Sequence, residues 1–191
     1  MSYLVVGCRC LLAELFVVAA VSKLRNRAAL AGFVAWIRES GLVGSRWVRP
    51  AAGLVVVGEL ASPALLAVPA TQTAGFAAAA VLLVVLSASI AGALRRGRRA
   101  PCRCFGASTR ALGVPHVVRN LVLLATALVG WLESIRPPAA GPQLAGVAVA
   151  AGAAGIGVVL LAALDDLVGL FAGHPPVAGT SLPELAERER V

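Results

Sequence analysis

Long apolar runs, separated by short polar segments, make up most of the chain. Four of them cover residues 3–21, 51–68, 74–94 and 114–131, and a fifth, rich in Gly and Ala, covers 144–164. A helix of about 20 mostly apolar residues is long enough to cross the hydrocarbon core of a bilayer. The pattern therefore predicts an all-α polytopic membrane protein, with a four-helix transmembrane bundle and a fifth, peripheral transmembrane helix.

The connections between the runs predict how the helices are arranged. The segments 69–73 and 133–143 are short, which makes the helices that they join antiparallel neighbours, and the charges inside the runs lie in the first, second and fourth of them. We therefore expect the first four runs to form the core. Residues 1–132 are predicted to form the four-helix domain, 133–172 the linker and fifth helix, and 173–191 a polar tail.

The segment between the first two runs, residues 22–50, is basic and contains short apolar pieces. The longest apolar piece is Ala28–Ile37, and the aromatic residues Phe33, Trp36 and Trp47 follow the pattern of a segment that lies along a membrane surface. Its start is also the basic flank that ends the first run, which we expect to be a retained helix and not a cleaved signal peptide.

Composition supports a membrane protein and gives its expected orientation. Hydrophobic residues make up 59% of the chain and charged residues 14%, whereas soluble domains carry about a quarter charged residues. Six basic side chains lie in segment 22–50 and seven in 95–119. The net charge of +8 thus reflects membrane topology and does not indicate nucleic-acid binding. The positive-inside rule predicts a bacterial inner-membrane protein with its N-terminus outside and loop 95–119 inside.

The loop 95–113 carries the residues with the most specific chemistry. Cys102 and Cys104 are one residue apart, between Pro101 and Gly106. A disulfide between them would be strained and easily reduced, and the arginines of the loop would favour the thiolate. The pair is therefore a candidate for thiol–disulfide exchange. A static disulfide, two idle thiols and a metal site remain alternatives, although two ligands alone make a weak metal site.

A second pair, Cys8 and Cys10, lies inside the first apolar run. Side chains two positions apart on a helix point to opposite sides, so we do not expect these two to bond to each other. One interpretation is that each is a small buried hydrophobic residue. The other is that one of them is a secondary thiol that takes part in the exchange.

Charged and polar residues within the runs form a second candidate site. Glu14 and Glu59 lie in the first and second runs, and His116, Arg119 and Asn120 open the fourth. Ionisable side chains in a membrane face the bundle interior and pair with one another. We expect Glu59 to pair with Arg119, directly or through Asn120, in a polar pocket with His116 at its rim. The pair would be a structural lock, a proton relay or a site for a quinone-like or thiol substrate.

Several motifs together resemble the MauE family of methylamine-utilisation membrane proteins, which is related to DoxX-type proteins. They are VSKLRN at Val21–Asn26, VGELASPALL at Val57–Leu66, CRCFG at Cys102–Gly106 and VRN at Val118–Asn120. They span roughly residues 4–132, and CxCFG followed by RN is the most specific. The resemblance implies a four-helix core, a role in redox maturation of exported proteins and a thioredoxin-like partner. It places the thiol chemistry outside the cytoplasm, opposite to the charge count.

Three functions follow as hypotheses. The leading one is a membrane thiol–disulfide oxidoreductase or electron conduit that uses Cys102 and Cys104 and passes electrons to a membrane quinone or to the second cysteine pair. The second is a non-enzymatic scaffold for a redox or maturation complex, and the third is a small-molecule carrier. The sequence does not name the partner, the electron acceptor or the oligomeric state.

Overall fold

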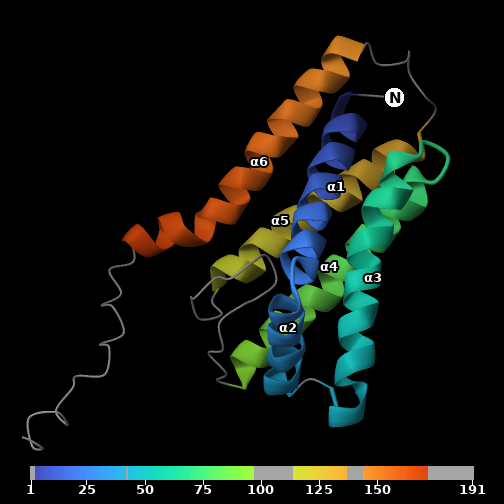
Figure 1. The fold of residues 1–191 in the computed structure, drawn as a ribbon. Coiled ribbons are helices and arrows are strands. Elements are labelled where there is room, and N and C mark those ends of the chain that lie inside the picture. The colour runs from blue at the N-terminus through green and yellow to red at the C-terminus, as the bar shows by residue number, and fades with distance from the viewer. Residues whose placement is uncertain (1–2, 42, 97–113, 137–143, 172–191) are drawn as a thin grey trace, which may run out of the picture.

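The structure is a computed structural model that describes residues 3–41, 43–96, 114–136 and 144–171. These residues form helices, and no strand is found among them (Figure 1). The expected cysteine loop and the polar tail lie outside the described residues. The elements in chain order are α1 (Tyr3–Leu24), α2 (Arg27–Ser40), the short 3₁₀ helix η1 (Ser45–Trp47), α3 (Val48–Ala67), α4 (Gln72–Arg95), α5 (Val114–Ser134) and α6 (Leu144–Phe171).

Helices α1, α3, α4 and α5 form the four-helix bundle that the apolar runs predict. Each is long and apolar enough to cross a membrane. They pack in a ring in which α1 and α4 both contact α3 and α5 but scarcely touch each other. Consecutive members of the ring run in opposite directions (Figure 1). We call the end of the bundle where α1 and α4 finish and α3 and α5 begin the lower end, as it is drawn in Figure 1.

The outer surface of this ring is apolar, as an integral membrane protein requires. Large aliphatic side chains of the ring helices point away from the bundle. On α3 and α4 they are Leu54, Val57, Leu60, Val81, Val84 and Val85. In water such a surface would drive aggregation, whereas in a bilayer it meets lipid chains at no cost.

Helix α6 lies outside the ring, as predicted for the fifth apolar run. It packs along α1 and makes few contacts with α5 (Figure 1). Its described apolar stretch, Ala145–Leu161, is shorter than the four spanning helices. The packing is close because small residues of α6 face α1. A Cβ atom at Gly146 would lie 2.1 Å from the Tyr3 ring, and one at Gly157 would lie 3.1 Å from Leu11.

Helix α2 closes the lower end of the bundle, and its two aromatic residues are buried in protein. Phe33 and Trp36 stack with ring centroids 6.2 Å apart, and both are buried against residues of α3 and α4, Val48, Ala52, Ile90 and Ala93 among them. Trp47, in η1, remains 57% exposed. Phe33, Trp36 and Ile37 of α2 therefore pack against protein, whereas Arg27, Ala28, Leu30, Ala31, Arg38 and Glu39 are exposed.

A side-chain cap fixes where α2 begins. The Oδ1 atom of Asn26 accepts a hydrogen bond of 2.7 Å from the backbone N–H of Ala29, and Gly41 ends the helix in the left-handed conformation at φ 59°. We expect Asn26→Ala to destabilise α2 by about 0.5–2 kcal/mol, because the first turn loses an acceptor. Asn26→Asp, which keeps the acceptor, is the control. Hydrogen exchange of α2 measures the difference, and equal exchange in the two variants would contradict the role of the cap.

A proline interrupts the hydrogen bonding of α3 in the last quarter of the helix. Pro63 lies inside the helix and has no N–H to donate to the carbonyl of Glu59, four residues earlier. The helix continues to Ala67 in spite of this.

Candidate functional site

Two apolar clusters fill the bundle, and buried polar side chains lie between them. The lower cluster contains Phe33 and Trp36 of α2 and Val56 of α3, and the upper cluster contains Phe16 of α1 and Leu66 of α3. Glu59 and Ser62 lie between Val56 and Leu66 on α3 and are buried. The same order holds on α5, where Val117 packs against the lower cluster and Leu123 belongs to the upper. We call the buried polar side chains at this level the polar layer: Lys23, Glu59, Ser62, Arg119 and Asn120.

An ion pair between α1 and α3 is the best-defined contact of the polar layer. Lys23 Nζ lies 2.7 Å from Glu59 Oε1 and 3.0 Å from Oε2, and each side chain is 2% exposed. The ammonium group also donates to the carbonyl of Ala19 at 3.3 Å and lies 5.1 Å from the centroid of the Phe33 ring. The carboxylate, the carbonyl and the aromatic face together replace the water that Lys23 loses on burial.

This contact shows that the expected pairing of Glu59 with Arg119 was wrong. The sequence places Lys23 in the basic flank of the first apolar run, where a lysine normally reaches water. In the structure α1 extends to Leu24, and α2 folds back so that Phe33 covers the lysine side chain. Lys23 is therefore buried and reaches Glu59, and sequence reasoning missed it as a residue of the site.

The other polar residues predicted for this site lie on α5 at the same end of the bundle. His116 and Arg119 are buried at 3% and 4% exposure, and Asn120 is fully buried. Within the described part of the chain, neither amide atom of Asn120 has a hydrogen-bond partner. Burying an amide without partners costs free energy, so the packing around Asn120 leaves a hydrogen-bonding requirement unmet in the described part of the chain.

The two cysteine pairs are associated with different parts of the molecule. Cys102 and Cys104 lie outside the described residues, but the loop that carries them leaves α4 after Arg96 and enters α5 at Val114, both at the lower end. The second pair lies in the half of α1 nearer the N-terminus. Cys8 is buried in the upper apolar cluster, whereas Cys10 is half-buried, and both are free thiols.

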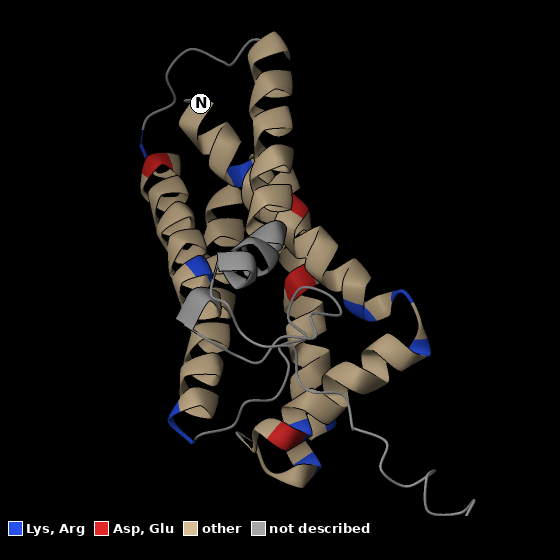
Figure 2. Cartoon of the chain, turned by 90° about the vertical axis from the view of Figure 1, so that its left-hand side faces the viewer, with Lys and Arg blue, Asp and Glu red and all other residues tan. Residues whose placement is uncertain are grey.

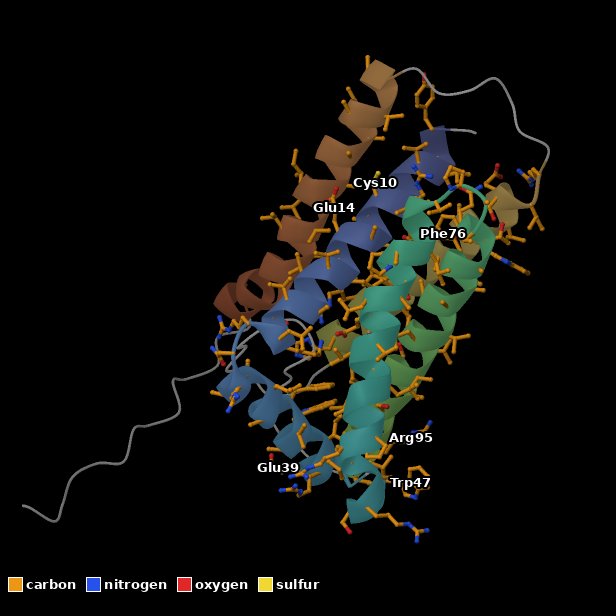
Figure 3. All side chains as sticks on the ribbon, turned by 45° about the vertical axis from the view of Figure 1, so that its right-hand side comes forward. Cys10, Glu14, Glu39, Trp47, Phe76 and Arg95 are labelled. Carbon is orange, nitrogen blue, oxygen red and sulfur yellow. The ribbon has the colours of Figure 1, made fainter. Side chains whose placement is uncertain are left out.

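Glu14 does not join the polar layer, although the sequence grouped it with Glu59 and Arg119. It lies nine residues before Lys23 on α1, which is about 13 Å along the helix axis. Its carboxylate faces α6, where a Cβ atom at Gly155 would lie 3.3 Å from Oε2 (Figure 3). The two intramembrane carboxylates thus occupy separate sites.

The exposed basic residues lie mostly around the lower end. Figure 2 shows most of the blue segments of the ribbon, which mark Lys and Arg, toward that end and few near the opposite end. Arg25, Arg27, Arg38, Arg46, Arg49, Arg95 and Arg96 are exposed in the structure. Arg96 also donates to the carbonyl of Gly41 at 3.3 Å, which ties the end of α4 to the end of α2. Among the described residues no group of three His, Cys, Asp or Glu side chains is placed to hold a metal ion.

Comparison with known proteins agrees with this architecture. No curated protein and no solved structure matches the chain. The family model described as "Methylamine utilisation protein MauE" matches residues 1–133, which cover α1 to α4 and all but the last residue of α5 and end before α6. The match covers well over half of the sequence, and the four apolar helices fit an integral membrane protein. The chain therefore belongs to the MauE family of methylamine utilisation proteins.

Proposed function

We propose that this member of the MauE family is a membrane thiol–disulfide oxidoreductase that supports the redox maturation of a partner protein. The observation that carries the proposal is where the described chain stops before the two cysteines and where it resumes after them. The end of α4 and the start of α5, which flank this segment, both lie at the lower end of the bundle, the end that α2 closes. Arg95 and Arg96 are exposed at the start of the loop, where their charge favours a thiolate on a neighbouring cysteine.

The reaction is a thiol–disulfide exchange. A thiolate of a reduced, thioredoxin-like partner attacks one sulfur of the Cys102–Cys104 disulfide, which forms a mixed disulfide and releases the other cysteine as a thiolate. A second partner thiolate then attacks the mixed disulfide, so the partner leaves oxidised and both loop cysteines are reduced. Their reoxidation releases two electrons and two protons, and a membrane quinone is the class of acceptor that would take them up as it becomes a quinol.

The polar layer supports an acceptor site of this kind. Asn120 offers both a donor and an acceptor in a fully buried position, and the carbonyl oxygen of a quinone accepts hydrogen bonds from such a donor. The Lys23–Glu59 pair supplies acidic and basic groups at the same level of the bundle. These residues would hold the polar head, and the apolar surroundings would hold the rest of the ring.

For the orientation we propose that the lower end faces the inside of the cell, as the distribution of arginines favours. Thiol chemistry of exported proteins would favour the opposite face. Maleimide labelling of Cys102 and Cys104 in intact and lysed cells separates the two. Labelling only after lysis supports the proposed orientation, and equal labelling of intact cells contradicts it.

Alkylation followed by mass analysis tests the oxidoreductase function itself. We expect Cys102 and Cys104 to be protected from alkylation until a reductant is added, and Cys104→Ser to trap a partner on Cys102, or the reverse. Cys8→Ser is the matched control, because Cys8 is buried in the upper cluster, and it should leave trapping unchanged. Thiols that are always free, or a disulfide that resists reduction in the folded protein, would contradict the proposal and favour a scaffold.

A further inference from the structure

One face of α1 carries polar residues although it points away from the bundle. Tyr3, Gly7, Cys10 and Glu14 follow one another at spacings of four, three and four, which places them on one side of a helix. The buried residues that pack into the bundle, such as Leu12 and Phe16, lie on the other side. Without α6, Cys10 and Glu14 would therefore face lipid.

Helix α6 covers this face with its glycines. Gly146 lies against Tyr3, and Gly155 leaves room for the Glu14 carboxylate, since a Cβ atom there would lie 3.3 Å from Oε2. Figure 3 shows Cys10 and Glu14 on the side of α1 that faces α6. Because the match to the MauE family model ends at residue 133, the helix that covers this carboxylate lies beyond the matched part of the chain.

The position of Glu14 along α1 places it deep in the membrane. It is eleven residues from Tyr3 and ten from Leu24, the two ends of the helix. At about 1.5 Å per residue, it lies about 15 Å from either end, which is half of a hydrocarbon core about 30 Å thick.

No positive charge in the described part of the chain neutralises Glu14. It takes part in no hydrogen bond or ion pair there, and the stretch Ala145–Leu161 of α6 contains no charged or titratable residue. On α1 the neighbouring groups are Arg9 and Cys10. Arg9 lies five residues before Glu14, about 140° around the helix, and the Cys10 thiol shares the face of Glu14. An ionised carboxylate in hydrocarbon is so costly that the group is neutralised instead.

We propose that Glu14 is a proton-binding site in the middle of the membrane, with α6 as its cover. The carboxyl group carries a proton while α6 is packed against it, and exchange of that proton requires the contact between α1 and α6 to loosen. The site is separate from the polar layer and does not depend on the thiol chemistry of the cysteine loop.

Carbodiimide labelling in native membranes tests the site directly. The carboxyl group adds to a C=N bond of dicyclohexylcarbodiimide, with its oxygen bonding to carbon and its proton passing to nitrogen. The adduct rearranges to a stable acylurea whose mass is that of the peptide plus one reagent molecule. We expect this apolar reagent to modify Glu14 and a water-soluble carbodiimide to leave it unmodified. Glu39, which is exposed on α2, is the internal control for the water-soluble reagent.

Two outcomes would overturn the proton-binding site. One is modification of Glu14 by both reagents at the same rate, which would show a carboxylate in water. The other is no modification of Glu14 by the apolar reagent even at acidic pH. Glu14→Gln should abolish the labelled peptide, and Glu59→Gln should leave it in place, so that the labelled carboxyl is assigned without regard to activity.

A pair of glycine variants tests the cover. Gly155→Ala puts a methyl group against the Glu14 carboxylate and should slow its labelling. Gly152→Ala, on the same helix, meets no atom within 4 Å and should label at the original rate. Equal rates in both variants would show that α6 does not control access to Glu14.

Discussion

Removal of either charge of the Lys23–Glu59 pair is expected to destabilise the protein by about 3–5 kcal/mol, the cost of leaving one buried charge without its partner. Glu59→Gln removes the carboxylate from the Lys23 ammonium group, which is 2% exposed and lies beside the Ala19 carbonyl and the Phe33 ring. Lys23→Met leaves the carboxylate in the same surroundings. The free energy of unfolding of the purified protein in detergent is the measurement.

The double variant Lys23→Met/Glu59→Gln should recover much of this loss, because no uncompensated charge remains. Arg25→Met, which removes an exposed charge two residues further on, should change stability by less than about 1 kcal/mol. If Arg119→Gln, and not Lys23→Met, restores the stability of Glu59→Gln, the ion pair described here is wrong. If neither Glu59→Gln nor Lys23→Met lowers the free energy of unfolding, the ion pair is contradicted as well.

Gly130→Ala is expected to cost about 1–3 kcal/mol, as is usual when an atom is added to a filled core. A Cβ atom at this position would lie 2.3 Å from Cε1 of Phe76, and the Phe76 ring is fully buried in the upper cluster. Neither the ring nor the backbone can move away without disturbing the contact between α4 and α5. Thermal unfolding of the solubilised protein measures the effect.

Two further variants make this test specific. Gly53→Ala, on α3, meets no atom within 4 Å and should not destabilise the protein. Gly130→Ala/Phe76→Leu should be more stable than the sum of its single variants, because the smaller side chain leaves space for the new methyl group. A Gly130→Ala variant as stable as Gly53→Ala would contradict the close packing of α4 on α5.

The helices could be predicted from the sequence because each apolar run is nearly uniform. The run 74–94, for example, is observed as Gln72–Arg95, since any chain in hydrocarbon must satisfy its backbone hydrogen bonds within the helix. The position of the fifth helix outside the core was also predicted, because the motifs that resemble the MauE family end before its run and that run carries no charge.

The partners within the polar layer could not be predicted from the sequence. Periodicity shows which side of a helix a residue occupies, but the choice between Lys23 and Arg119 for Glu59 depends on where α2 folds. The apolar face of α2 is equally suited to packing against lipid and against protein. It packs against protein because apolar residues of α3 and α4 are available at the lower end of the bundle. The sequence around a lysine in the last turn of a helix does not show whether another helix will cover that side chain.

The proline in α3 has a mechanical consequence for the ion pair. The hydrogen bond that Pro63 cannot make is the one to the carbonyl of Glu59, so the helix is weakest at the residue that holds Lys23. If α3 bends, this is where it would bend most easily. A tilt of the part of α3 below Glu59, which α2 contacts, would be transmitted through the salt bridge as a pull on α1.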